Sequence, residues 1–254
     1  MNGDLFILLE DKHCLAVAKP AGLLTQSASP EIPSLEAIAK AYLKEKHHKP
    51  GNVYLGVPHR LDRPVSGVVL FARNSKSAER LAEQFRERTV TKVYWGVVEG
   101  KLEPAEGNWE DWLLKAPDEA RVAIADASVA GAKRAELRYR VLKYVDENYV
   151  ADTSALTPGP SPSGRGENTL VEFVPITGRS HQIRVQAASR GVPLLGDALY
   201  GSTGSFGPPA ELPRDRIIAL HGRSLTFLHP LHYEPITLAA PLPAYWRDVG
   251  VTDE

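Results

Sequence analysis

The sequence of 254 residues contains a single cysteine, Cys14. One thiol can form neither an internal disulfide nor a cluster of thiolate metal ligands, so both ways of stabilising a fold are excluded. A low cysteine content fits a reducing compartment and points away from secretion. We interpret Cys14 as a small buried hydrophobic residue.

Long apolar runs are also absent. No stretch approaches the ~20 apolar residues that a membrane-spanning helix requires. The N-terminal stretch MNGDLFILLEDKHC carries acidic residues where a secretory signal peptide carries basic ones. These absences predict a cytoplasmic protein without a membrane partner.

The chain has no excess of positive charge either. Lys and Arg together number 30 against 31 Asp and Glu, which gives a formal net charge of -1. No global positive field attracts nucleic acid to such a chain, so a polyanion would have to bind at a local basic face. The sequence also lacks the residue spacing of a metal site. The histidine pairs do not have the spacing, or the neighbouring acidic residues, of a known site; these pairs are His47 with His48 and His229 with His232. We interpret these histidines as solvated surface residues.

The sequence does contain many short apolar runs, which predict β-strands. They are LFILL, CLAVA, VYLGV, GVVLFA, KVYWGVV, AELRYRVL, TLVEFVPI and ALHGRSLTFL. Helical spacing of apolar residues follows Ser34 and Ser75, each a candidate N-cap, and a third helix is predicted from Ser180 to Arg190, before Gly191. Strands outnumber helices and several follow one another directly. We therefore predict an α+β fold with a mixed, largely antiparallel β-sheet and flanking helices and loops.

One segment interrupts this pattern. The stretch LTPGPSPSGRGEN, residues 156–168, is rich in Gly and Pro and has no hydrophobic period, so it is predicted to be a disordered insert. Both flanks are strand-like, and the insert most simply lengthens a hairpin connection, with a domain linker as the alternative. We predict a single domain over residues 1–254.

The stretch PHRLDRPVSG places Asp62 between Arg60 and Arg63, on a loop that follows a strand end. Loops on a rigid scaffold often display catalytic groups. If at least one guanidinium also lies near the carboxylate in space, the ionised form is favoured, and Asp62 could act as a nucleophile. A structural ion pair that fixes the loop is the alternative.

Two further stretches bear on this choice. In residues 175–201, a helix that starts near Ser180 would place His181 and Arg184 on one face, from which a cation could reach the Asp62 loop. In TKVYWGVVEG, Tyr94 alternates with Trp95 on a strand, where core packing is the ordinary role. Asp197 in LLGDALYG is interpreted as a turn or loop-bracing residue.

The blocks KPAGLLTQ, HRLDRPVSG, KVYWGVVEG and GRSHQIRVQAASRGVPLLGDALYG, in this order, resemble the RluA family of pseudouridine synthases, which isomerise uridine in RNA. The resemblance implies the mixed-sheet catalytic domain of that family, without metal or cofactor. It implies that Asp62 is the catalytic aspartate, Tyr94 the active-site tyrosine and Arg184 the basic partner of the carboxylate. Arg60 matches the arginine that holds RNA open around the target uridine, and Arg63, Arg179 and His181 are assigned to RNA contacts.

The resemblance also implies an RNA partner, a stem-loop of ribosomal or transfer RNA, and we expect a monomer. By this resemblance we expect the chain to begin directly at the catalytic domain, without the S4-type domain of many relatives. The residues leave open whether Asp62 adds to C6 of the base or acts at C1′ of the sugar. Two alternatives remain: an RNA-binding module on the same fold without catalysis, and a glycosidic-bond hydrolase that uses Asp62 and Asp197.

Overall fold

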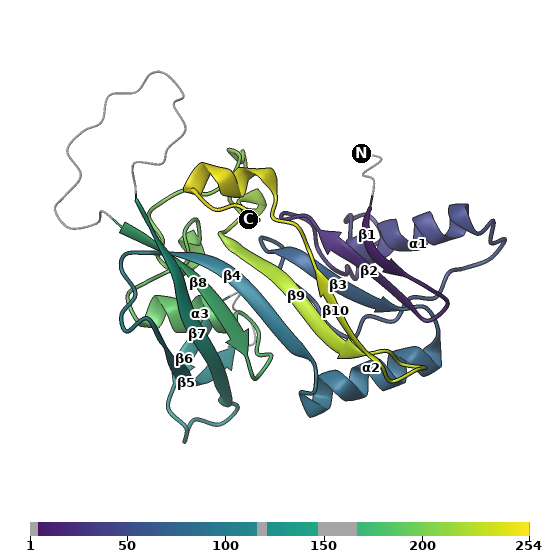
Figure 1. Ribbon diagram of the computed structural model, residues 1–254, viewed down its shortest axis with the longest axis horizontal. Coiled ribbons are helices and arrows are strands. Elements are labelled where there is room, and N and C mark those ends of the chain that lie inside the picture. The colour runs from purple at the N-terminus through teal and green to yellow at the C-terminus, as the bar shows by residue number, and fades with distance from the viewer. Residues whose placement is uncertain (1–4, 116–120, 147–166, 254) are drawn as a thin grey trace. The chain divides into compact units, whose positions relative to one another are not determined.

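The computed structural model describes residues 5–115, 121–146 and 167–253 (Figure 1). Within these ranges the strands form a ten-stranded, mixed and mostly antiparallel sheet with few helices, which confirms the predicted fold class. The chain divides into two compact units, Met1–Val93 with His221–Pro241, and Tyr94–Leu220 with Leu242–Glu254. The single domain over residues 1–254 stays a prediction. None of the helices in the described ranges combines the length and the apolar character that a bilayer crossing requires.

The first unit contains an antiparallel meander and a parallel partner. Strands β1, β2 and β3 pair antiparallel, β3 pairs parallel with β9, and β10 pairs antiparallel with β9. The parallel contact consists of Ser66 opposite His221 and Gly67 opposite Gly222. The strands are β1 (Phe6–Glu10), β2 (Cys14–Lys19), β3 (Ser66–Ala72), β9 (Leu220–Leu228) and β10 (Pro235–Ala239).

Two helices belong to this unit, and their starts depend on capping side chains. Helix α1 (Leu35–Lys46) begins after Ser34, whose hydroxyl accepts a hydrogen bond from the backbone N–H of Ala37, as predicted. Helix α2 (Ser75–Glu87) begins one residue earlier than predicted, because the side chain of Asn74 takes the capping role and accepts from the N–H of Ser77.

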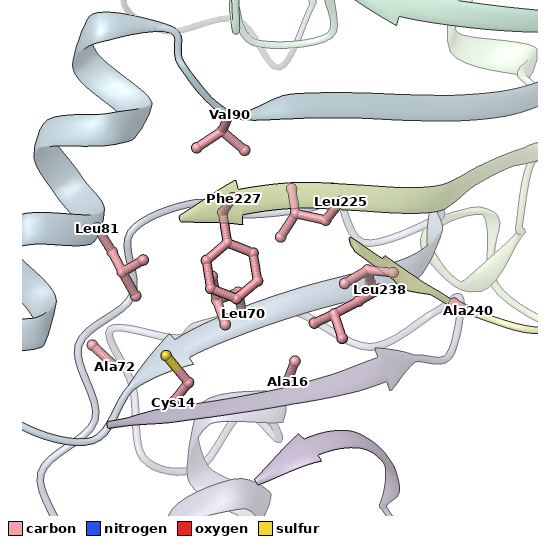
Figure 2. Packing of buried hydrophobic residues seen from close by; sticks show 11 residues of the cluster. Cys14, Ala16, Leu70, Ala72, Leu81, Val90, Leu225, Phe227, Leu238 and Ala240 are labelled. Carbon is pink, nitrogen blue, oxygen red and sulfur yellow. The ribbon is translucent and has the colours of Figure 1, made fainter. Parts of the chain in front are cut away.

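One hydrophobic cluster of the first unit lies between the sheet and α2 (Figure 2). Alternate residues of β2 and β3 point to the same face, and there they meet Leu81 of α2 and Phe227 of β9. The cluster comprises Cys14, Ala16, Val68, Leu70, Ala72, Leu81, Val90, Leu225, Phe227, Leu238 and Ala240. Every residue of β3 is buried, so the strand that follows the Asp62 loop is fixed on both faces.

The second unit is built on an antiparallel sheet in the order β4-β8-β7-β5-β6. Its strands are β4 (Thr91–Glu99), β5 (Glu106–Lys115), β6 (Val122–Ala125), β7 (Lys133–Asp146) and β8 (Glu167–Pro175). Strands β7 and β8 are paired as far as Asp146 opposite Glu167, so the predicted insert joins the two strands of a hairpin. Glu167 and Asn168, the last two residues of the predicted insert, belong to β8, so the insert was predicted two residues too long. Residues 156–166 lie outside the described residues, and their predicted disorder stays a prediction.

Helix α3 (Gln182–Ser189) begins two residues later than predicted. His181 has a φ of 52°, in the left-handed region, and cannot be part of a right-handed helix. The side chain of Gln182 stabilises this start, since its Oε1 accepts from the hydroxyl of Thr177 and from the N–H of Arg179. The described part of the chain also contains three short 3₁₀ helices: η1 (Ala198–Tyr200), η2 (Pro213–Asp215) and η3 (Ala244–Val249).

The strand predicted at VYLGV is wrong. Only Gly56 of this run forms an isolated bridge, with Ala72 of β3. A Cβ on Gly56 would lie 2.6 Å from the side chain of Ala78 on α2, so the chain passes too close to the helix for any larger residue at this position. Strands β5, β6 and β10 were not predicted, because many of their residues are polar or exposed and the apolar alternation is weak.

Candidate active site

Asp62 lies on the loop that leads into β3, as predicted. Along this loop Arg60 is exposed, Leu61 is buried and Asp62 is half-buried. The N–H of Val65 donates to the carbonyl of Asp62 over 3.1 Å, which closes a turn around the aspartate. The loop therefore presents one carboxylate, with a buried leucine as its neighbour and an arginine in solvent.

The segment of residues 19–25, part of the KPAGLLTQ block, holds this loop in place. The buried hydroxyl of Thr25 donates to the carbonyl of Leu61 (2.9 Å) and accepts from the N–H of the same residue (3.1 Å). The N–H of Gly22 donates to the carbonyl of Arg63, and Nε of Arg63 donates to the carbonyl of Gly22. The backbone on both sides of Asp62 is thus held by hydrogen bonds to this segment.

Lys19 is the buried cation of the same segment, only 1% exposed. Its ammonium group donates to three carbonyl oxygens, those of Pro20 (3.0 Å), Leu23 (2.7 Å) and Arg63 (3.3 Å). Burial lowers the pKa of Lys19 to about 7, while the charge of Asp62 opposes the shift. The charges of Lys19 and Asp62 therefore attract each other. The KPAGLLTQ block contributed to the family resemblance, but no role was predicted for Lys19 or Thr25. A lysine at the end of an apolar strand was a usable signal for a buried cation.

In the second unit, Arg184 and Asp197 form a buried ion pair. Nε of Arg184 lies 2.7 Å from Oδ2 of Asp197, and Nη2 lies 2.8 Å from Oδ1. Such a two-pronged pair is strong and fixes the plane of the guanidinium. The interpretation of Asp197 as a loop-bracing residue fits this contact. The residue that Asp197 binds, Arg184, is itself a predicted site residue.

Tyr200 connects this ion pair to His181. The guanidinium carbon of Arg184 lies 5.1 Å from the centre of the Tyr200 ring. The Tyr200 hydroxyl accepts from the N–H of Val122 and lies 2.9 Å from Nδ1 of His181. His181 and Arg184 thus share one partner, although His181 precedes the helix instead of lying in it.

Two further predicted residues lie on the second unit. Tyr94 is half-buried on β4, opposite Phe173 of β8. Arg179 precedes α3, and its Nε donates to the carbonyl of Arg134 on β7 over 3.0 Å. The predicted roles of Tyr94, Arg179 and His181 towards RNA stay predictions.

Asp11, Cys14 and His229 bring three metal-ligand types within 4.8 Å of one another. His229 is buried, so its interpretation as a surface residue is wrong. Its Nδ1 accepts from the N–H groups of Leu231 and His232, and its Nε2 therefore carries the proton and donates to Asp11. A metal ion on Nε2 would require an imidazolate, so these contacts do not fit a metal centre.

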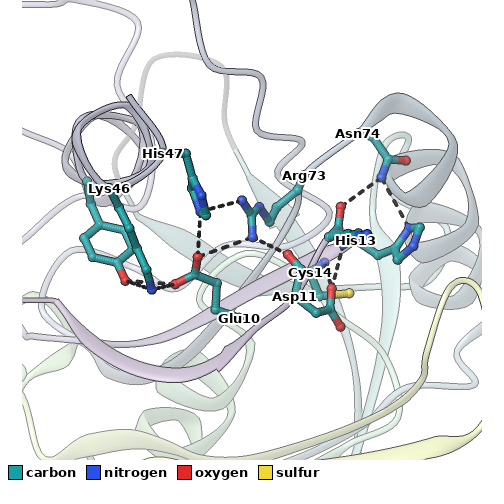
Figure 3. Close-up of polar contacts among 10 residues, drawn as sticks. Glu10, Asp11, His13, Cys14, Lys46, His47, Arg73 and Asn74 are labelled. Carbon is teal, nitrogen blue, oxygen red and sulfur yellow. Dashed lines mark hydrogen bonds and ion pairs between the residues drawn. The ribbon is translucent and has the colours of Figure 1, made fainter. Parts of the chain in front are cut away.

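The remaining partners of this group are structural as well (Figure 3). Oδ1 of Asp11 accepts from the N–H groups of His13 and Cys14, each over 2.6 Å. The neighbouring Glu10 is also held: desolvation opposes the shift, but hydrogen bonds from Lys46, Tyr42 and His47 lower the pKa of Glu10 to about 2. Burial raises the pKa of the Cys14 thiol to about 12, so this sulfur is protonated at neutral pH.

A protein-family model described as RNA pseudouridylate synthase matches residues 13–189, more than half of the chain. The chain belongs to the RluA family of RNA pseudouridine synthases. It is accordingly an RNA pseudouridine synthase, an intramolecular isomerase. This family membership favours a pseudouridine synthase over the hydrolase and over the RNA-binding module without catalysis.

Relatives that are named for different RNA substrates show about the same sequence identity to this synthase. The "Ribosomal large subunit pseudouridine synthase C" of Rickettsia felis is 30% identical over 96% of this chain and 69% of the relative. The "tRNA pseudouridine synthase C" of Haemophilus ducreyi is 31% identical over 96% and 93%. Among solved structures, "Human RNA Pseudouridylate Synthase Domain Containing 4" matches with a TM-score of 0.71 and 23% identity over 96% of this chain and 91% of that one. That likeness supports the fold.

Proposed function

We propose that this synthase converts one specific uridine of a structured RNA, ribosomal or transfer, into pseudouridine, with Asp62 as the catalytic carboxylate. The reaction breaks the bond from N1 of uracil to C1′ and joins C5 to C1′. An ionised carboxylate can form a covalent intermediate with the sugar or with the ring, which divides the difficult step into two easier ones. Tyr94 and Arg184 take the roles of active-site tyrosine and active-site cation.

The observation that carries this proposal is the fixed loop around Asp62. Thr25, Gly22 and Lys19 bind the backbone on both sides of the aspartate, so the backbone that carries the carboxylate is held in place. A nucleophile held in one orientation gains rate, because the ordering of the reacting groups is completed during folding. A carboxylate whose role was only to pair with arginines would not require a loop backbone held by these hydrogen bonds.

Arg60 is proposed to hold the RNA open, with Arg63, Arg179 and His181 as further RNA contacts. A uridine within a stem must leave its stack before a carboxylate can reach it, at a cost of a few kcal/mol. Arg60 is exposed two residues before Asp62, where its guanidinium can occupy the space of an extruded base. The side chain would then lower the free energy of the flipped state and leave the chemical step unchanged.

We expect Arg60→Ala to reduce pseudouridine formation more on a stable stem-loop than on the same stem destabilised by mismatches. The loss on the stable stem should be about 10- to 100-fold, in line with an unstacking cost of a few kcal/mol. The measurement is the single-turnover rate on both RNAs, with the exposed Arg86 of α2 as control in the variant Arg86→Ala. Equal proportional losses on the two RNAs would contradict the opening role.

The substrate is tested by treating unmodified ribosomal and transfer RNA with the purified protein and mapping pseudouridine along each chain. We expect modification at one position in one class of RNA. Modification at many unrelated uridines, or none in either class, would overturn the proposed specificity for a structured site.

A further inference from the structure

A hydrogen bond from β3 to His59 anchors the loop before Asp62. Nε2 of His59 accepts from the N–H of Leu70 over 2.9 Å, and its ring stacks on Phe85 of α2 at 4.7 Å with an interplanar angle of 15°. A ring nitrogen that accepts an N–H carries no proton. Desolvation, with a smaller effect of the Lys92 ammonium, lowers the pKa of His59 to about 3, which keeps the acceptor available at neutral pH.

A second imidazole anchors the loop after Asp62. Nδ1 of His221 lies 2.8 Å from the hydroxyl of Ser66, and Nε2 lies 3.2 Å from the carbonyl of Ala240. A carbonyl only accepts, so Nε2 carries a proton, and in the neutral imidazole Nδ1 then accepts from Ser66. The serine is 2% exposed and the histidine 1% exposed.

The backbone next to this second anchor leaves no room for a side chain at Gly67. Ser66 and His221 face each other in the parallel contact between β3 and β9, next to Gly67 and Gly222. A Cβ on Gly67 would lie 2.4 Å from the backbone of Gly222, and the φ of Gly67 is +128°. Only glycine permits this approach and this conformation. The end of the loop is therefore tied to a point where two strands are in direct backbone contact.

We propose that His59 and the Ser66–His221 pair are positioning residues for Asp62, one at each end of the loop formed by residues 60–65. The inference rests on the proposed catalytic role of Asp62. His59 accepts a hydrogen bond from the backbone N–H of Leu70, and the side chain of His221 pairs with that of Ser66. Neither contact needs to touch RNA to support the loop. Since small displacements of a reacting group reduce rates strongly, loss of an anchor should reduce the rate of the chemical step and leave RNA affinity unchanged.

The first test compares two buried serines with the same partner type. Ser77 on α2 is also 2% exposed, and its hydroxyl lies 3.3 Å from Nδ1 of His13. We expect Ser66→Ala to lower the single-turnover rate constant at saturating enzyme by about 10- to 100-fold with an unchanged Kd for RNA. Ser77→Ala should keep the rate within about twofold, because it does not support the loop. Thermal unfolding of both variants measures any loss of stability.

The second test keeps or removes the acceptor at position 59. His59→Gln places an amide oxygen near the position of Nε2, and His59→Leu leaves the N–H of Leu70 without its acceptor. We expect the glutamine variant to recover most of the single-turnover rate that the leucine variant loses. Equal rates for these two variants would overturn the role of His59.

A rate loss that follows only the unfolded fraction, equally in Ser66→Ala and Ser77→Ala, would overturn the role of the Ser66–His221 pair. A loss of RNA affinity with an unchanged rate constant would do the same. Asp62→Asn separates this inference from the proposed function. If Asp62→Asn is inactive and Ser66→Ala is as fast as wild type, only the positioning role fails. If Asp62→Asn keeps its activity, the catalytic assignment fails first.

Discussion

Asp62→Asn is expected to give a folded protein that binds RNA with wild-type affinity and forms pseudouridine at less than about 1% of the wild-type rate. The amide keeps the size and shape of the side chain, so the hydrogen bonds of Thr25 and Lys19 to the loop backbone remain. The negative charge is lost, and an amide cannot attack the sugar or the ring. The measurement is pseudouridine formation under single-turnover conditions, with RNA affinity determined on the same preparation.

Asp11→Asn is the matched control for this result. Asp11 is a partly buried aspartate of the same unit, with hydrogen bonds to His229 and to the backbone. Its replacement should leave the rate within about twofold, because the group takes no part in the reaction. A rate of Asp62→Asn above a few per cent of wild type would show that the carboxylate at position 62 is not the reacting group.

Asp197→Ala is expected to lower the free energy of unfolding by about 3–5 kcal/mol, because it removes a buried carboxylate that forms a two-pronged ion pair with the buried guanidinium of Arg184. This loss is large compared with the stability of most domains. The measurement is equilibrium unfolding in urea, compared between variant and wild type at the same pH. The ring of Tyr200 remains beside the guanidinium and cannot replace a carboxylate.

The chain offers a control with nearly the same geometry in solvent. Nε and Nη2 of Arg134 lie 2.7 and 2.8 Å from the two carboxylate oxygens of Glu110, and both residues are exposed. Glu110→Ala should cost far less stability, because Arg134 is exposed to water and keeps its ion pair with Glu136, 3.1 Å from Nη1. If the two variants lose the same amount, burial does not determine the strength of the Arg184–Asp197 pair.

Local signals in the sequence predicted much of the fold. Ser34 caps α1 through its own hydroxyl, and short apolar runs identified β2, β3 and β8. The VYLGV run failed because a close approach to α2 determines its conformation, and helical spacing could not reveal the left-handed backbone of His181. Nearby residues cannot report on such tertiary constraints.

The candidate site divides in the same way. The motif around Asp62 was visible, because a carboxylate between two arginines is unusual in a loop. Its support was not visible: Thr25 lies 36 positions from Leu61, and His221 lies 155 positions from Ser66. The partner of Arg184 was equally hidden, since only the folded chain brings Asp197 to the guanidinium. Long-range hydrogen bonds of this kind leave no periodic pattern in the sequence.

The environment of Cys14 has a practical consequence for spectroscopy. The thiol is fully buried in the cluster between the sheet and α2, and its pKa is raised to about 12. Maleimides react with the thiolate of an accessible cysteine. The sulfur of Cys14 is neither accessible nor deprotonated at neutral pH. A cysteine introduced on the surface, for example at the exposed Tyr54, would therefore be the reactive thiol, and a fluorophore could be attached there with the native cysteine left in place.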